Sequence, residues 1–102
     1  MIKVTVMYPN STDITFDMEY YAKTHIPMVQ QLLGEALKKT ELEVGISGAA
    51  PSEPAPFVAI ANLYFETLES FQTSFGPHVA TIVADTPNYS NVQGEIQIGK
   101  IV

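Results

Sequence analysis

The chain has 102 residues, the length of one domain, and its 46% hydrophobic content is typical of a packed globule. Its formal net charge of −6, with only 5 lysine and arginine residues, excludes the basic face that binding to nucleic acid or anionic lipid requires. It contains no cysteine, which excludes disulfides, thiolate nucleophiles and cysteine-ligated metal sites.

We expect a single domain over residues 1–102. The first residues alternate directly as a strand, without the basic and then apolar segments of a signal peptide. No apolar run approaches the roughly 18 residues of a membrane span. A cytoplasmic protein without a membrane or nucleic-acid partner is therefore expected.

The first segment of the chain predicts a strand followed by a helix. Apolar and polar residues alternate over 2–8, as in a half-buried strand, and 9–13 is rich in turn-forming residues. Asp17 can cap the following helix by accepting its free N–H groups. Phe16 and Tyr21 flank this cap with the spacing of a hydrophobic staple.

Two residues are expected to interrupt this first helix. Pro27 has no N–H to donate, so we expect a kink or restart near His25-Ile26. Gly34 is a poor helix former, and the helix is predicted to end there or to run to about Leu37.

The rest of the chain predicts three strands and a divided helix. Segment 57–65 is apolar at almost every position, which is typical of a central strand covered on both faces. Thr67 can cap a helix that ends at Gly76, and Pro77 can start a second one. The predicted strands are 41–46, 57–65 and 91–101, with a loop over 47–56.

The order of elements is β-α-β-β-α-β, which indicates an α+β, ferredoxin-like fold with a four-stranded antiparallel sheet. Helices would then cover one face only. The other face would carry either Ile101 or the row from Val92 to Ile98. Packing of two copies by two-fold symmetry is the simplest way to bury that face, so we expect a homodimer through the sheet.

His25 is the first candidate for chemistry, because it falls on the apolar side of the first helix. An imidazole there can act as general base or acid near neutral pH, or as a metal or haem ligand. Alternatively, it is a structural histidine bonded to a backbone carbonyl freed at Pro27. Tyr21, four residues earlier, can hold a substrate oxygen or orient the imidazole, or it serves only as the staple. Tyr20 is expected to be rotated away, towards a flank of the pocket, the partner subunit or only solvent.

A second group of candidates begins at the divided helix. His78 lies in a helix start whose open N–H groups could receive an anion or carbonyl. Asp85 lies at a helix C-terminus, where a negative charge is unfavourable and must be compensated or useful. We expect Asp85 to pair with His25 in space; the alternative is a turn residue before Thr86-Pro87. Tyr89 either caps a cavity or packs on the sheet.

Several site types are missing from the sequence. The two histidines do not have metal-ligand spacing, so no metal site is predicted. There is no glycine-rich phosphate loop, dinucleotide fingerprint or nucleophilic-serine elbow.

The sequence resembles the EthD family over nearly its whole length. The resemblance is carried by Phe16-Asp17, Tyr20-Tyr21, His25 and Pro27 in the first helix, and more loosely by Tyr8-Pro9, Phe71, Phe75-Gly76, Asp85 and Tyr89. It implies a dimeric α/β barrel with a cavity between sheet and helices in each subunit. By position, His25 matches the family's helix-one histidine, and Tyr21 and Asp85 match neighbouring motif positions.

Three hypotheses for function follow. The first is a cofactor-independent oxidoreductase or catabolic accessory acting on a small apolar or aromatic molecule, with His25, Tyr21 and Asp85 as catalytic residues. Its predicted substrate-binding residues are mostly aromatic: Phe16, Phe71, Phe75, His78 and Tyr89. The second is a haem-dependent monooxygenase-like protein with His25 as axial ligand. The third is a non-catalytic ligand-binding or dimeric scaffold protein.

Overall fold

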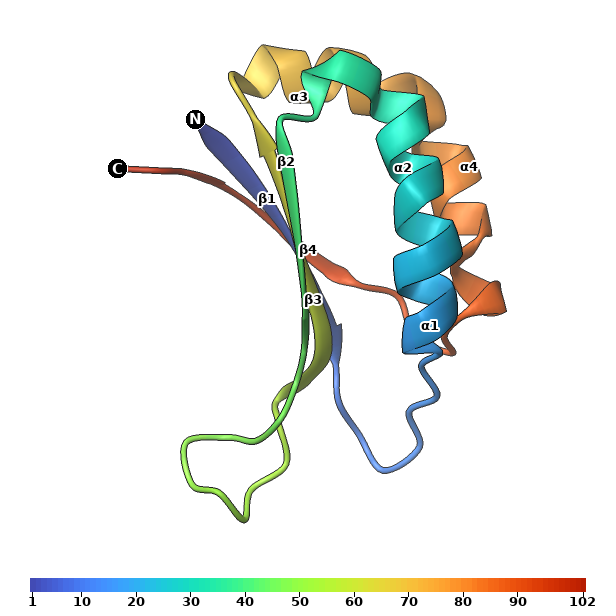
Figure 1. The fold of residues 1–102 in the computed structure, drawn as a ribbon, viewed down its shortest axis with the longest axis vertical. Helices are drawn as coiled ribbons and strands as arrows, with labels where there is room; N and C mark the ends of the chain where they lie inside the picture. Colours follow the sequence, from blue (N-terminus) through green and yellow to red (C-terminus); the bar gives the residue numbers. More distant parts are fainter.

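The computed structural model describes all residues, 1–102, and contains one four-stranded antiparallel sheet (Figure 1). The spatial order is β2-β3-β1-β4, so the chain's first and third strands lie at the centre. This order and the β-α-β-β-α-β succession confirm the predicted α+β, ferredoxin-like fold. The strands are β1 (Ile2–Pro9), β2 (Lys39–Val44), β3 (Phe57–Phe65) and β4 (Glu95–Lys100).

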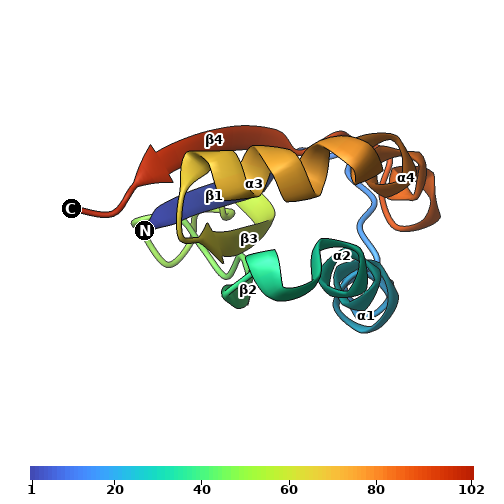
Figure 2. The ribbon, with the colours of Figure 1, turned by 90° about the horizontal axis from the view of Figure 1, so that it is seen from above.

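The helices all lie on one face of the sheet, as Figures 1 and 2 show from two directions. The first helical segment comprises α1 (Met18–Tyr20), a π-helical turn (Tyr21–His25) and α2 (Ile26–Leu33). The second comprises α3 (Leu68–Phe75) and α4 (Val79–Ala84), joined by a 3-10 turn (Gly76–His78). Further 3-10 turns lie at Gly34–Ala36 and Thr86–Asn88. None of these helices is long and apolar enough to span a membrane.

Both predicted helix caps are confirmed. Asp17 Oδ1 accepts a hydrogen bond from the Tyr20 N–H at 3.0 Å, and Thr67 Oγ1 accepts one from the Ser70 N–H at 3.0 Å. The rings of Phe16 and Tyr21 lie 5.1 Å apart across the first cap.

Pro27 changes the first helix without interrupting it. The Ile26 N–H donates to the Tyr21 carbonyl, five residues earlier, which is the bond of a π-helical turn. Because Pro27 can donate no hydrogen bond and its ring crowds the carbonyl four residues before it, the preceding turn widens. The expected kink or restart is therefore a widened turn in a continuous helix. Gly34, at φ 59°, ends α2.

The strand register separates the two faces of the sheet. Val4 lies between Leu63 and Ile98 on the face towards the helices, together with the other even-numbered residues of β1. The prediction that β3 is apolar on both faces needs correction, because Asn62 and Tyr64 lie on the opposite face, where Tyr64 donates to Glu41. The Ile96–Ile98 row faces the helices.

The last strand starts later than predicted, at Glu95 rather than residue 91. The Val92 N–H donates its hydrogen bond to the Ser90 side chain and not to a neighbouring strand. Gly94 then passes so close to the sheet that an added Cβ would lie 2.6 Å from a methyl of Val6. This path leads the chain past one end of the core before it enters β4.

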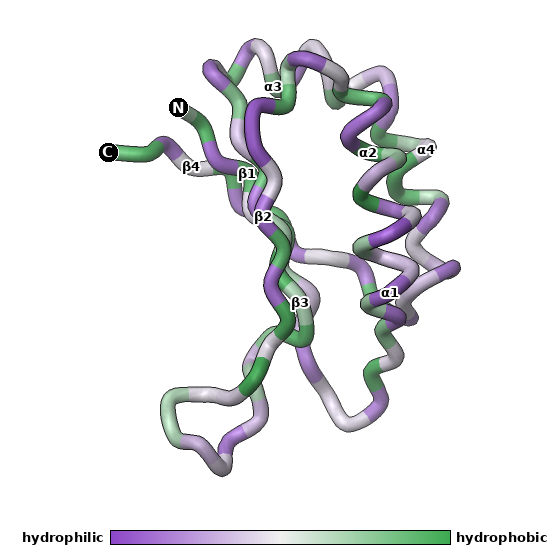
Figure 3. Tube along the Cα trace, viewed as in Figure 1, coloured by the Kyte–Doolittle hydropathy of each residue, from purple (hydrophilic) through white to green (hydrophobic).

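Hydrophobic positions recur along β3 and α2 and occupy most of α4 (Figure 3). Two buried clusters fill the space between the sheet and the helices. One is aliphatic and phenylalanine-rich, around Val29, Leu33 and Phe65; the other is tyrosine-rich, around Tyr8, Tyr21 and Tyr89. The candidate site lies where these clusters meet.

Candidate active site

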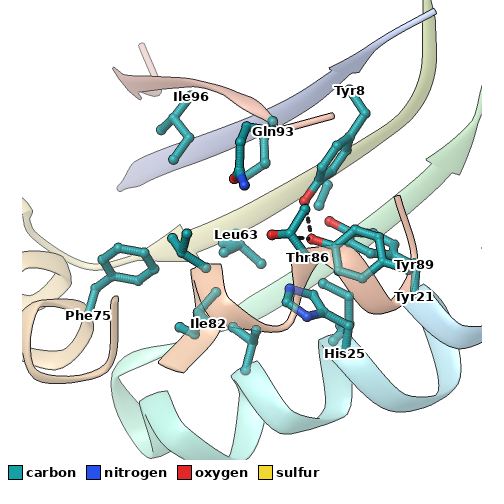
Figure 4. A pocket seen from close by; sticks show the side chains of 16 residues that line it. Tyr8, Tyr21, His25, Leu63, Phe75, Ile82, Thr86, Tyr89, Gln93 and Ile96 are labelled. Atoms are coloured by element: carbon teal, nitrogen blue, oxygen red, sulfur yellow. Dashed lines mark hydrogen bonds between the residues drawn. The ribbon is translucent and has the colours of Figure 1, made fainter. Parts of the chain in front are cut away.

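A cavity of about 80 Å³ lies between the sheet and the helices (Figure 4). Its sheet side is formed by β1, β3 and β4, and its helix side by the π-helical turn, α2 and α4. Figure 4 shows that it has a polar end, with His25, Thr86 and the tyrosines, and an apolar end, with Phe75 and Ile82. Such a cavity suits a ligand that is mostly hydrocarbon with one polar group.

His25 and Asp85 form a hydrogen-bonded pair at the polar end. His25 Nδ1 lies 2.9 Å from Asp85 Oδ2, so the predicted pairing of these two residues is confirmed. His25 is only 3% exposed, and Asp85 lies behind it at the C-terminus of α4. The imidazole compensates the unfavourable position of the carboxylate at a helix C-terminus.

Two further side chains hold the Asp85 carboxylate. Its Oδ1 accepts hydrogen bonds from Asn88 Nδ2 at 2.8 Å and from the Tyr20 hydroxyl at 2.9 Å. Burial opposes ionisation of this carboxyl, but the hydrogen bonds from Asn88, His25 and Tyr20 outweigh burial and lower its pKa. Asp85 is therefore ionised at neutral pH and can only accept protons in hydrogen bonds.

The ionised carboxylate determines the tautomer of the imidazole. Since Asp85 can only accept, the Nδ1 that faces it carries the proton in neutral His25, and Nε2 has a free lone pair. Nε2 makes no hydrogen bond within the chain. Because His25 lines the cavity, Nε2 is the ring nitrogen that remains for a bound molecule.

The widened helical turn sets the orientation of the imidazole. Tyr21 and His25 begin and end this turn, and their rings stack at 5.3 Å with an angle of 15°. Tyr89 closes the other side, with its ring centroid 4.6 Å from that of His25. His25 is thus held between two aromatic rings and a carboxylate, a degree of fixation typical of functional groups.

Three hydroxyl groups meet above His25 (Figure 4). The hydroxyls of Tyr8 and Tyr89 are 2.8 Å apart, and Thr86 Oγ1 lies 3.5 Å from the Tyr89 hydroxyl. Burial raises the pKa of Tyr8, Tyr21 and Tyr89 well above the ordinary value. These phenols therefore keep their protons and serve as hydrogen-bond donors at neutral pH.

Several predicted site residues come together in the structure. Tyr21, His25, Phe75 and Tyr89 all line the cavity, and Asp85 contacts it through His25. Tyr20 does not line the cavity, and of the alternatives for it the structure shows the flank of the site, where its hydroxyl donates to Asp85.

Three residues predicted to bind substrate lie outside the cavity. Phe16 packs behind it against the rings of Tyr8 and Tyr89, because it precedes the helix. Phe71 is one helical turn before Phe75 and packs against Phe65 in the aliphatic, phenylalanine-rich cluster. His78 is half-buried in the turn between α3 and α4 and does not line the cavity.

Sequence reasoning missed Tyr8, Thr86, Asn88 and Gln93. Tyr8 belonged to the inward-facing row of the first strand, which was a usable signal. Asn88 follows Asp85 by three residues, a spacing that brings side chains together only once the 3-10 turn is known. Thr86 and Gln93 carried no recognisable sequence signal.

A comparison with protein families identifies the chain. Residues 11–93 match the EthD domain. The chain belongs to the EthD family. Among curated proteins, it is 29% identical over 92 residues to an uncharacterized 11.0 kDa protein from the thcB-thcC intergenic region of Rhodococcus erythropolis, covering 89% of this chain and 85% of that protein.

Solved structures agree with this membership. An EthD-like protein from Ralstonia eutropha JMP134 is 37% identical and superimposes with a TM-score of 0.94, covering 99% of this chain and 91% of that one. An ethyl tert-butyl ether degradation (EthD) family protein from Bacillus halodurans C-125 is 18% identical, with a TM-score of 0.76 and coverage of 100% and 99%. HapK from Hahella chejuensis, at 12% identity and a TM-score of 0.63, covers 100% of this chain and 93% of its own and shares the fold.

The residues of this EthD-family site do not fit a haem. A cavity of about 80 Å³ is too small for a tetrapyrrole, and no lysine or arginine lines it to pair with propionates. Nor do three or more His, Asp or Glu side chains gather anywhere in the chain as a metal ligand set. What the arrangement can do by itself is exchange a proton with a bound molecule.

Proposed function

We propose that this EthD-family protein is a cofactor-independent enzyme that removes a proton from a small apolar or aromatic molecule. His25 is the general base, acting through Nε2, and Asp85 is the residue that positions and stabilises it. The observation that carries the proposal is the 2.9 Å bond between His25 Nδ1 and Asp85 Oδ2 at the wall of an apolar cavity. A non-catalytic binding protein would need the cavity but not this pair.

The proposed step uses both ring nitrogens of His25. Nε2 accepts the substrate proton, and the resulting imidazolium is stabilised by the Asp85 carboxylate on Nδ1. A general base held in this way contributes about 10²- to 10⁴-fold to a rate. Loss of the proton leaves the substrate electron-rich, which is also the form that reacts with an oxidant. The oxidoreductase expected from the sequence would therefore begin with the same step.

Hydrogen exchange into small carbon acids tests this proposal without knowledge of the natural substrate. Cyclopentanone, γ-butyrolactone and nitroethane would be incubated with the protein in D2O, and deuterium incorporation would be followed by NMR. We expect the wild type to accelerate exchange of at least one compound, His25→Gln to lose the acceleration, and the control His78→Gln to retain it. Equal rates for wild type and His25→Gln would contradict the proposal.

We also propose that the protein is a homodimer formed through the sheet face opposite the helices. Half-buried Met7 and Ile60 lie opposite each other there, and the buried Asn62 Oδ1 on the same face has no hydrogen-bond partner. Light scattering coupled to gel filtration tests this. We expect a dimer for the wild type, a monomer for Ile60→Glu, and a dimer for the control Ile46→Glu in the exposed loop. A monomeric wild type would contradict the proposal.

A further inference from the structure

We infer that the paired hydroxyls of Tyr8 and Tyr89 bind the carbonyl oxygen of the substrate, and that the substrate is a small, neutral, enolisable carbonyl compound. This inference rests on the proposed role of His25, because it names the molecule from which that base removes a proton. Tyr8, Tyr89 and His25 all line the polar end of the cavity (Figure 4).

The number of protons on the two phenols supports an oxygen-binding role. Each hydroxyl has one proton to donate, and the single bond of 2.8 Å between them uses one of the two. The remaining proton has two alternatives: Thr86 Oγ1, 3.5 Å from the Tyr89 hydroxyl and beyond the usual distance of a hydroxyl hydrogen bond, and the hydroxyl of Tyr21 beside Tyr8. Three phenols then share two mutual bonds, so one O–H of this group is available to a ligand in the cavity.

The charges around the cavity favour a neutral carbonyl over an acid. No lysine or arginine lines it, and the carboxylate of Asp85 lies directly behind His25. A carboxylate or phosphate ligand would be buried without a cation to pair with it. Because burial raises the pKa of both Tyr8 and Tyr89, they act as donors, which leaves His25 Nε2 as the proton acceptor.

The step balances without an oxidant or cofactor. His25 Nε2 takes a proton from the carbon next to the carbonyl, the C–H electron pair forms a C=C bond, and the carbonyl π pair moves to oxygen. The resulting enolate oxygen is stabilised by the free tyrosine O–H, in the manner of an oxyanion hole. Return of the proton to the same or a conjugated carbon completes an exchange or an isomerisation.

The size and opening of the cavity limit the rest of the substrate. About 80 Å³ is less than the roughly 150 Å³ of an engineered cavity that holds benzene. A ring would therefore extend past Val83 and Ile96, which line the cavity yet remain 46% and 56% exposed. The hydrocarbon part of the substrate lies at this apolar, open end.

4-Fluorophenol is a suitable probe, because its neutral hydroxyl resembles that of an enol, whose oxygen can accept a tyrosine hydrogen bond while its O–H faces His25, and 19F NMR reports binding directly. We expect the wild type to bind it and the double variant Tyr8→Phe/Tyr89→Phe, which removes both donors with little change of shape, to bind about tenfold or more weakly. Each single variant should lie in between. The control Tyr64→Phe, on the opposite face of the sheet, should match the wild type. A wild type that does not bind the probe, or a double variant that binds it equally, would overturn the inference.

The exchange assay distinguishes failure of this inference from failure of the proposed function. If His25→Gln keeps exchange activity while the double tyrosine variant loses 4-fluorophenol binding, His25 is not the base but the oxygen site stands. If His25→Gln abolishes exchange while the double variant binds and exchanges like the wild type, the base stands and the oxygen site is refuted. Among the carbon acids, the inference expects the ketone and lactone to depend on both tyrosines.

Discussion

His25 and Asp85 are 60 positions apart in the sequence, yet His25 Nδ1 lies 2.9 Å from Asp85 Oδ2. The pair joins the two helical segments at the point where each changes its winding. His25 ends the π-helical turn, and Asp85 links α4 to the 3-10 turn Thr86–Asn88. The irregular turns, more than the regular helices, place the two groups at the cavity.

Replacing Asp85 with asparagine should impair the base more than the cavity. The amide of Asp85→Asn lacks the negative charge that stabilises imidazolium and can present an N–H to Nδ1, which would reverse the tautomer. We expect the exchange rate to fall by about 10²-fold or more, with 4-fluorophenol affinity nearly unchanged. Equal losses of rate and affinity would indicate a collapsed cavity instead of a misoriented base.

The lowered pKa of Asp85 predicts a specific pH dependence of stability. Because the carboxyl ionises more readily in the folded state, its contribution is fully present above the ordinary pKa of 3.8 and is lost as pH falls through the lower, folded value. The difference in unfolding free energy between wild type and Asp85→Asn should shrink as the pH falls below 3.8. Urea unfolding at several pH values measures it; a difference that grows in acid would contradict the assignment.

Removal of the side chains that hydrogen-bond to Asp85 should raise the pKa of its carboxyl. Asn88→Ala and Tyr20→Phe each delete one hydrogen bond to Oδ1, so the carboxylate is stabilised less and the protonated carboxyl is relatively favoured. A 13C NMR titration of the Asp85 carboxyl should show an upward shift in each variant. Unchanged titration in both would mean that these contacts do not form in solution.

Gly94 should tolerate a methyl group less well than Gly99. An added Cβ at Gly94 would lie 2.6 Å from Val6 Cγ1 and 3.2 Å from the Tyr8 ring, whereas at Gly99 nothing lies within 4 Å. We expect Gly94→Ala to destabilise the protein by about 1–3 kcal/mol, and Gly99→Ala to stay within about 0.5 kcal/mol of wild type. Thermal unfolding of both variants makes the comparison, and equal stabilities would contradict the path assigned to the chain before β4.

Local signals in the sequence predicted much of the fold. Alternation predicted β1 and a continuous apolar run predicted β3, while short polar side chains before apolar helical spacing located the caps at Asp17 and Thr67. The inward position of His25 followed from helical periodicity, and its pairing with Asp85 from the cost of a carboxylate at a helix C-terminus.

The features that the sequence could not predict depend on packing between distant segments. Tyr20 reaches Asp85 because the phenol is long and the end of α4 lies beside it, which helical periodicity alone does not reveal. Phe71 and Phe75 stack on each other and pack in the same cluster, but only Phe75 lines the cavity. The pairing of Tyr8 with Tyr89 spans 81 positions and joins a strand to a loop.

The most direct test of the account is a long-range 1H–15N correlation spectrum of the His25 imidazole in its neutral form. The account predicts that Nδ1 carries the proton, bonded to Asp85, and that Nε2 has the chemical shift of an unprotonated nitrogen, as a base facing the cavity must. A proton on Nε2 would contradict it, because His25 would then have no lone pair to offer to a bound molecule.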